Sequence, residues 1–349
     1  MRRAGTALLA AITAAAALTA VPAQASPRRG GLGHCTATAP FVCHFDVAPG
    51  TYRVSALLGG GTEAGATRVT AETRRAVLAE TPNAPGERVR RSFTVDVRTP
   101  EGEPTGPGGT PGLDLTFDGA APQLAALRVT RVRTSQILLA GDSTVCDQPG
   151  DPYNGWGQQL PQYLTDRISV ANYADSGESS QTFLDNPALF ATLRTRIHHG
   201  DLVLVQLAHN DKQTDRDTYR ANLTAMIEGI RAEGGRPVLV TPIVRRWFNA
   251  DGTLDNGTAL IVNGLGVDLP AELRTLATEQ HTPLVDLTAL SKARVEALGP
   301  EGSKAYYLYN EKKDNTHTSA TGAAAFAQLV LGELRAKGLV PASSVRPPS

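Results

Sequence analysis

Residues 137–143 of this chain read ILLAGDS, a short apolar run that stops at a Gly-Asp-Ser turn. A continuous apolar run bounded by turn residues is typical of a strand buried on both faces of a parallel sheet. Similar runs follow at Ser169–Tyr173, Leu202–Leu207, Pro237–Thr241 and Pro283–Leu287. We therefore expect a sheet of five parallel strands after Thr134.

Helical patterns separate these strands, notably at Asp217–Glu233 and Leu269–Gln280, and Ser319–Lys337 closes the region. Strands that alternate with amphipathic helices predict right-handed crossovers, with helices on both faces of the sheet. In such open α/β sheets, the functional site lies at the carboxyl ends of the strands.

The segment before this region has a different pattern, that of short strands separated by Gly- and Pro-rich turns. Around Phe93, Val95 and Val97, for example, apolar residues alternate with polar ones, as expected for a half-buried strand. The pattern predicts an all-β sandwich over residues 34–133. Its expected strands are Phe41–Val47, Tyr52–Leu58, Thr67–Glu72, Val89–Val97, Leu113–Phe117 and Leu124–Val132.

The amino terminus predicts export. Arg2 and Arg3 precede an apolar stretch, Ala7–Ala20, and Ala23-Gln24-Ala25 fits a signal-peptidase site. We expect a signal peptide over residues 1–25, cleaved to give a secreted, extracellular monomer without a membrane anchor, because the apolar stretch is too short to span a bilayer. The 34 basic and 34 acidic residues balance, which argues against nucleic acid as a partner.

Three cysteines are present, and export permits disulfides. Cys35 and Cys43 lie close together in the sequence and are the favoured pair, which leaves Cys146 unpaired. His34 and His44 flank that pair, so a zinc site is the alternative. We expect no metal and no cofactor.

Polar residues follow the predicted strands where the topology requires a site. Ser143 follows the first strand, and Asp314 and His317 precede the last helix. A serine becomes a nucleophile when a base accepts its proton and a third group orients that base. His317 and Asp314 supply those two roles, although each motif taken alone is also ordinary turn or capping chemistry.

An acyl-transfer site also needs donors for the oxyanion. Gly177, after the second strand, can bring its N–H close to a substrate because it has no side chain, and Asn210, after the third, carries a side-chain amide. A further donor is expected near Ser143, whose turn we place beside a helix amino terminus.

These blocks resemble those of the SGNH, or GDSL-like, hydrolase superfamily. Residues 139–144 (LAGDST), 172–177 (NYADSG), 205–211 (VQLAHND) and 314–317 (DNTH) match its four blocks in order. The resemblance implies a flavodoxin-like three-layer α/β/α domain over residues 135–340, followed by a flexible tail at 341–349. It also implies Ser143, Asp314 and His317 as catalytic residues, with Ser143, Gly177 and Asn210 forming the oxyanion hole.

Within the superfamily, the chain resembles the rhamnogalacturonan acetylesterase branch in residues 155–158 (GWGQ), 241–242 (TP), 245–248 (RRWF) and 314–317 (DNTH). The β unit resembles the galactose-binding-like sandwich that precedes some bacterial members. The branch implies deacetylation of pectic polysaccharide. Candidate substrate-binding residues are Asn154, Trp156, Gln158, Glu178, Arg245, Arg246 and Trp247, with Trp156, Trp247 and Phe248 able either to stack on sugar rings or to pack in the core.

Two residues depart from the family pattern. Ala208 replaces the glycine that commonly precedes the His-Asn-Asp block, and Glu178 stands where a basic residue is common, which disfavours an anionic substrate. Three alternatives stay open: an acetylxylan esterase, a hydrolase of lipid or other short-chain esters, and a non-catalytic carbohydrate-binding protein.

Overall fold

The computed structural model describes Met1 and residues 31–347. The predicted signal peptide therefore lies, apart from Met1, outside the described residues, and so do residues 348–349. Within the described part, no helix is long and apolar enough to cross a membrane.

The amino-terminal unit is a sandwich of two antiparallel sheets, ordered β1-β6-β3-β4 and β5-β2-β7. Their inward faces share one core, to which Val54, Val69, Phe93 and Leu115 contribute. The predicted β sandwich is thus present. Its strands are β1 (Phe41–Phe45), β2 (Gly50–Gly59), β3 (Gly65–Ala71), β4 (Arg75–Asn83), β5 (Arg88–Val97), β6 (Leu113–Ala121) and β7 (Leu124–Arg131).

Strand β4 is absent from the sequence prediction. It pairs antiparallel with β3 after a turn in which Glu72 and Arg74 have positive φ angles of 51° and 55°. Glycine and asparagine are the usual residues in that left-handed conformation. Because Glu72 and Arg74 are neither, the composition of this turn does not reveal the hairpin.

The second unit is built on a parallel sheet ordered β12-β11-β10-β8-β9, which is the 2-1-3-4-5 order of a flavodoxin-like fold. Leu204 at its centre pairs with Leu139 on one side and Val238 on the other. The predicted fold class is therefore confirmed. The strands are β8 (Ser135–Gly141), β9 (Ile168–Asn172), β10 (Leu202–Gln206), β11 (Arg236–Val240) and β12 (Leu284–Val285).

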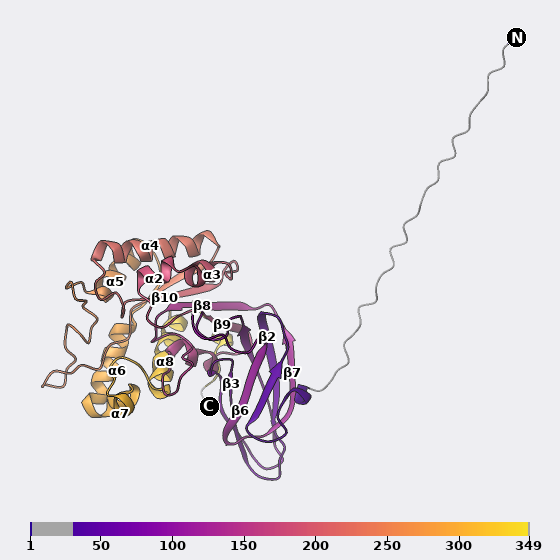
Figure 1. Ribbon diagram of the computed structural model, residues 1–349. Helices are drawn as coiled ribbons and strands as arrows, with labels where there is room; N and C mark the ends of the chain where they lie inside the picture. The colour runs from indigo at the N-terminus through magenta and orange to yellow at the C-terminus, as the bar shows by residue number, and fades with distance from the viewer. Residues whose placement is uncertain (2–30, 348–349) are drawn as a thin grey trace.

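Helices cover both faces of this sheet, with α2 to α5 on one side and α6 and α8 on the other (Figure 1). The long helices begin at side-chain caps: Asp215, Asp268 and Ser319 each accept a backbone N–H from the first turn. The helices are α1 (Trp156–Gln159), α2 (Ser180–Asp185), α3 (Thr192–Arg194), α4 (Arg216–Ala232), α5 (Leu269–Glu279), α6 (Leu287–Gly302), α7 (Tyr309–Lys312) and α8 (Ala320–Ala336).

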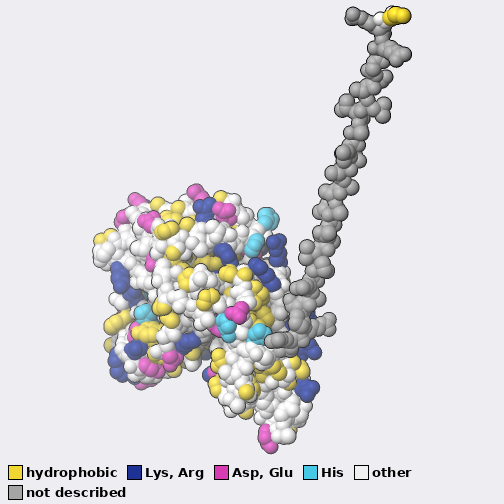
Figure 2. All heavy atoms as spheres, turned by 45° about the vertical axis from the view of Figure 1, so that its right-hand side comes forward, with side chains coloured by type: hydrophobic (Ala, Val, Ile, Leu, Met, Phe, Trp, Pro, Cys, Tyr) yellow, Lys and Arg dark blue, Asp and Glu magenta, His cyan; other side chains and the backbone are white. Residues whose placement is uncertain are grey.

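The two units share a polar interface. Arg75 at the start of β4 forms a buried ion pair with Asp147, with 2.6 Å between Nη2 and Oδ2. Thr94 on β5 donates to the carbonyl of Ile168 at the start of β9. On the outer surface, acidic and basic side chains are interspersed (Figure 2), as the balanced composition suggests.

The prediction of a flexible tail over residues 341–349 is wrong for its described part. Arg346 donates through its backbone N–H to Tyr163 and through its guanidinium to the carbonyl of Ser92. The carbonyl of Ser344, in turn, accepts from the backbone N–H of Thr165. These bonds hold the segment against both units, a long-range contact that its Pro- and Ser-rich composition does not indicate.

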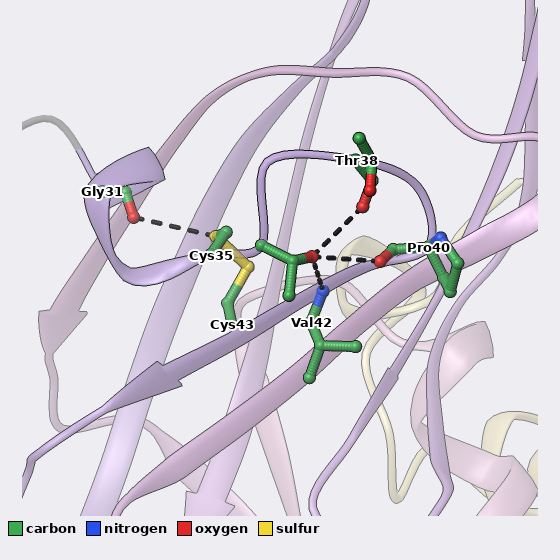
Figure 3. The surroundings of a disulfide bond; sticks show 7 residues. Gly31, Cys35, Thr38, Pro40, Val42 and Cys43 are labelled. Atoms are coloured by element: carbon green, nitrogen blue, oxygen red, sulfur yellow. Dashed lines mark hydrogen bonds between the residues drawn. A yellow bond between two sulfur atoms is a disulfide. The ribbon is translucent and has the colours of Figure 1, made fainter.

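Cys35 and Cys43 form the expected disulfide (Figure 3). His34 stacks on Phe45 and His44 contacts Asp114, so neither histidine is arranged around the two sulfur atoms. Across residues 31–347, no cluster of three or more His, Cys, Asp or Glu side chains could hold a metal ion. The zinc alternative is therefore wrong for this pair.

Candidate active site

The structure brings the three predicted catalytic residues into one hydrogen-bonded line. Ser143 Oγ lies 3.0 Å from Nε2 of His317, and Nδ1 of the same ring lies 2.7 Å from Oδ2 of Asp314. Ser143 comes from the turn after β8, and Asp314 and His317 come from the loop before α8, with His317 lying 174 positions from Ser143 in the sequence. This is the geometry of a nucleophile, a base and a group that orients the base.

The loop that carries Asp314 is arranged to keep its carboxylate ionised. Burial opposes the charge, but the His317 ring and the backbone N–H groups of His317 and Thr316 all donate to the carboxylate. Together they lower the pKa of Asp314 to about 2. A fixed negative charge at this position favours the imidazolium that forms when His317 accepts a proton.

The turn that carries Ser143 is a single turn and not the beginning of a helix. The backbone N–H groups of Val145 and Cys146 bond to the carbonyl of Asp142, and the first α-helix after it begins only at Trp156. The expectation of a helix amino terminus beside Ser143 is therefore wrong. The turn is held instead by Asp142 Oδ1, which accepts from both the N–H and the hydroxyl of Thr144.

The two predicted oxyanion donors lie on neighbouring loops. Residues 175–178, which we call the oxyanion loop, follow β9 and contain Gly177 with a φ of 85°. Asn210 follows β10, and its Nδ2 donates to the carbonyl of Glu178 at 3.1 Å. One N–H of that amide thus ties the two loops together, while the other stays available to a substrate oxygen.

Asp142 and His209, which the sequence analysis did not single out, join the turn that carries Ser143 (the nucleophile turn) to the loop that carries Asn210. His209 is buried, with Nδ1 lying 3.1 Å from Asp142 Oδ2 and Nε2 lying 3.1 Å from the carbonyl of Ile243. Burial disfavours the charge of Asp142, but His209 and Thr144 outweigh it and lower the pKa of that carboxyl. The signal was present in the two blocks, since each residue adjoins a predicted site residue.

The model of the GDSL-like lipase/acylhydrolase family matches residues 139–325, which include every residue of this site. The chain belongs to the GDSL-like lipase/acylhydrolase family. This acylhydrolase is accordingly a serine carboxylic ester hydrolase, as its sequence blocks predicted.

Two curated relatives of this acylhydrolase are named as rhamnogalacturonan acetylesterases of Bacillus subtilis (strain 168). RhgT is 35% identical over 220 residues, covering 58% of this chain and 91% of that protein. YesY, a probable rhamnogalacturonan acetylesterase, is 34% identical over 216 residues, covering 59% and 94%. These matches confirm the branch that the sequence resembles.

A solved structure shares both units of this acylhydrolase. The crystal structure of the Bacillus subtilis protein YxiM superposes with a TM-score of 0.54 and 25% identity, covering 86% of this chain and 81% of that one. A match of that extent includes the β sandwich as well as the hydrolase unit.

Three of the predicted substrate-binding residues of the acylhydrolase are buried, so their assignment is wrong. The Trp156 indole donates to Gln206 Oε1 at 2.9 Å, inside the core. Gln158 donates to the carbonyls of Thr73 and Gln148. Asn154 donates its backbone N–H to the carbonyl of Thr318, and so supports the loop that carries the catalytic histidine.

The four residues 245–248 have different surroundings. Arg246 is buried and bonds to Ser303 and Asn315, so it holds the Asp314 loop and does not face a substrate. Arg245 lies at the site: its Nη2 donates to the carbonyl of His209, and burial lowers its pKa although the Asp142 and Asp314 charges oppose that shift.

The aromatic side chains of this segment, Trp247 and Phe248, also differ in exposure. Trp247 is 48% exposed and remains a candidate for sugar stacking, whereas Phe248 is partly buried under the Arg246 guanidinium. Tyr153, which was not predicted, places its ring edge-to-face with His317 at 5.3 Å between centroids. It therefore forms one wall beside the base.

Proposed function

We propose that this ester hydrolase is a secreted, monomeric carbohydrate acetylesterase that removes O-acetyl groups from plant cell-wall polysaccharide, most specifically from rhamnogalacturonan. The observation that carries the proposal is the hydrogen-bonded line from Ser143 through His317 to Asp314. The substrate class rests on the names of RhgT and YesY, which match this chain over most of their own length.

The reaction proceeds in two halves. In the first, Ser143 Oγ attacks the acetyl carbonyl while its proton passes to Nε2 of His317, and that proton then leaves with the sugar hydroxyl as the C–O bond breaks. In the second, His317 takes a proton from water, the resulting hydroxide attacks the acetyl-enzyme, and acetate leaves as Ser143 recovers its proton. Asp314 holds Nδ1 of the ring throughout.

In both halves, the carbonyl oxygen becomes an oxyanion. The Gly177 and Ser143 N–H groups and the Asn210 amide are its proposed donors. Each such donor contributes about 3 kcal/mol to transition-state stabilisation in related chemistry. No metal ion or cofactor enters this scheme.

The proposal is tested by acetate release from acetylated rhamnogalacturonan and acetylxylan, measured side by side. Ser143→Ala should lower turnover of both by about 10⁴-fold or more. Ser135→Ala is a matched control, because Ser135 is exposed at the opposite end of the same strand. Undiminished turnover by Ser143→Ala would reject the mechanism, and a preference for acetylxylan would reject the substrate.

Glu178 provides a sharper test of the pectic substrate. Asn210 binds its backbone carbonyl, so Glu178→Gln removes the side-chain charge without removing that bond. If the carboxylate repels the uronate groups of rhamnogalacturonan, this variant should deacetylate that polymer faster and leave the rate on neutral acetylxylan unchanged. Equal effects on both polymers would show that Glu178 does not contact the uronate groups.

A further inference from the structure

The β sandwich reaches the oxyanion loop through the β5–β6 loop, residues 98–112. Glu103 Oε1 in this loop accepts the backbone N–H of Ser176 at 2.9 Å. The same oxygen accepts from the Cys146 thiol at 2.9 Å. One carboxylate of the first unit therefore joins the oxyanion loop to the end of the nucleophile turn.

A second contact lies one residue earlier in the oxyanion loop. Thr105 donates its backbone N–H to Asp175 Oδ1 at 2.9 Å, and its hydroxyl donates to Asp175 Oδ2. Asp175 is buried, and its own N–H bonds to the carbonyl of Gly141 at the end of β8. The two residues that precede Gly177 are thus each anchored to the β5–β6 loop.

Gly177 has few restraints of its own. Its φ of 85° is in the region that glycine favours, and apart from its two chain neighbours no residue has an atom within 4 Å of the position that a Cβ would occupy. Its N–H is therefore aimed by the anchors on either side: Glu103 and Thr105 before it, and the Asn210 amide on Glu178 after it. An oxyanion donor is effective only when it is already in place before the charge develops.

We propose that Glu103 and Thr105 are positioning residues, which hold the oxyanion loop so that the Gly177 N–H points at the developing oxyanion. This inference rests on the proposed role of Gly177 in ester hydrolysis. It assigns the β sandwich a part in the acylation and deacylation steps themselves, through its β5–β6 loop, beyond support of the fold.

Cys146 takes part as a hydrogen-bond donor. Its side chain is buried, and burial together with the Glu103 charge raises its pKa well above the ordinary thiol value. The thiol therefore stays protonated and donates to Glu103, which leaves the carboxylate as an acceptor for Ser176. The same protonation removes Cys146 as a rival nucleophile.

The test compares four variants of the full chain on an aryl acetate. Glu103→Ala removes the first anchor, and Thr105→Val removes the hydroxyl bond of the second but keeps its backbone N–H bond to Asp175. Glu103→Gln keeps an acceptor and Thr105→Ser keeps a hydroxyl donor at the same place. Removal of a complete oxyanion donor costs about 10²–10³-fold in kcat, so a misplaced donor should cost about 10- to 100-fold. We expect that loss in kcat for the first two variants, with KM within about twofold, and recovery of most activity in the two conservative variants.

A second readout addresses the oxyanion directly. The rate at which an aryl phosphonate modifies Ser143 should fall in parallel with kcat, because the phosphonylated serine places an anionic oxygen in the same hole. Thr110→Val is the matched control: Thr110 is exposed in the same loop, and its side chain makes no hydrogen bond in the described structure. It should retain the wild-type kcat.

Several outcomes would overturn the inference. These are kcat within twofold of wild type in both Glu103→Ala and Thr105→Val, a rise in KM at constant kcat, or an equal loss in Thr110→Val. Because Thr105 is exposed, Thr105→Val should fold even if Glu103→Ala does not, and it then tests the hydroxyl bond to Asp175. If Ser143→Ala abolishes turnover while the anchor variants retain it, only the positioning role fails. If Ser143→Ala retains turnover, the proposed function fails.

Discussion

Replacing Arg75 by methionine should destabilise the hydrolase unit, although Arg75 belongs to the β sandwich. Its Nε and Nη2 both donate to Asp147 Oδ2, at 2.9 and 2.6 Å, and its Nη1 donates to the carbonyl of Asp96. Both side chains of the ion pair are almost completely buried, at 1% and 0% exposure. The other carboxylate oxygen of Asp147 accepts from Asn172, which also bonds to the carbonyl of Val145 beside the nucleophile turn.

The size of the effect follows from the burial. When one partner of a buried ion pair is removed, the other charge stays in a low-dielectric site, and the loss of stability is about 3–5 kcal/mol. In Arg75→Met, the nearest remaining cation is Arg98, 3.9 Å from Asp147 Oδ2, which is too far for a normal hydrogen bond. The double variant Arg75→Met/Asp147→Asn removes both charges, so no unpaired charge of this ion pair stays buried. Its loss of unfolding free energy should therefore be smaller than the sum of the two single losses by about 2 kcal/mol or more.

Urea unfolding measures both quantities. The chain contains two tryptophans, Trp156 and Trp247, both in the hydrolase unit, so fluorescence reports on that unit and far-UV circular dichroism reports on the whole chain. We expect the fluorescence midpoint of Arg75→Met to fall at an unchanged m-value. A loss below about 1 kcal/mol, or additive single costs, would refute the claim that a buried charge pair joins the units.

Three further variants have expected outcomes. Asp314→Asn should lower kcat by about 10⁴-fold at similar KM in an aryl acetate assay. Because the pKa of Asp314 is lowered from 3.8 to about 2, its charge stabilises the fold above pH 3.8 and that contribution is lost as pH falls through about 2. The stability deficit of Asp314→Asn, about 1 kcal/mol after solvent screening, should therefore vanish there in acid titrations. Replacing Cys35 and Cys43 by alanine opens a loop with a sequence separation of 8 and should cost about 2.5 kcal/mol in thermal unfolding, with aryl acetate turnover unchanged. Trp156→Phe should cost about 1–3 kcal/mol in urea, because it leaves Gln206 Oε1 buried without its donor, and a neutral result would contradict the core placement.

The parts of the fold and site that the sequence predicts are those with a local signal. Leu202–Gln206, for example, is short and almost entirely apolar, and both features predict a buried strand. Once such strands are ordered as parallel neighbours, their carboxyl ends meet, and Ser143 and Asn210 are brought together by topology alone. Asp314 and His317 lie on one loop because they are only three residues apart in the sequence.

The substrate-binding residues have no such signal. Tryptophan and glutamine occur both in glycan-binding surfaces and in buried polar networks, and the choice depends on what packs against them. Gln158 is buried because carbonyls from Thr73 and Gln148 happen to face it, and Thr73 lies 85 positions away. Residues adjacent in one motif, such as Arg246 and Trp247, can consequently differ completely in exposure.

The same reasoning explains why the role of the β sandwich could not be deduced from the sequence. Its contacts with the segments next to the site come from the turn before β4, from the first residue of β4 and from the Pro/Gly-rich β5–β6 loop, where local patterns are weakest. Arg74 donates to the carbonyls of Gln148 and Tyr153, Arg75 pairs with Asp147, and Glu103 holds Ser176. Each contact meets a segment next to Ser143, His317 or Gly177. The β sandwich therefore supports the segments that carry or adjoin Ser143, His317 and Gly177. A separately attached binding module would have no physical reason to make these contacts.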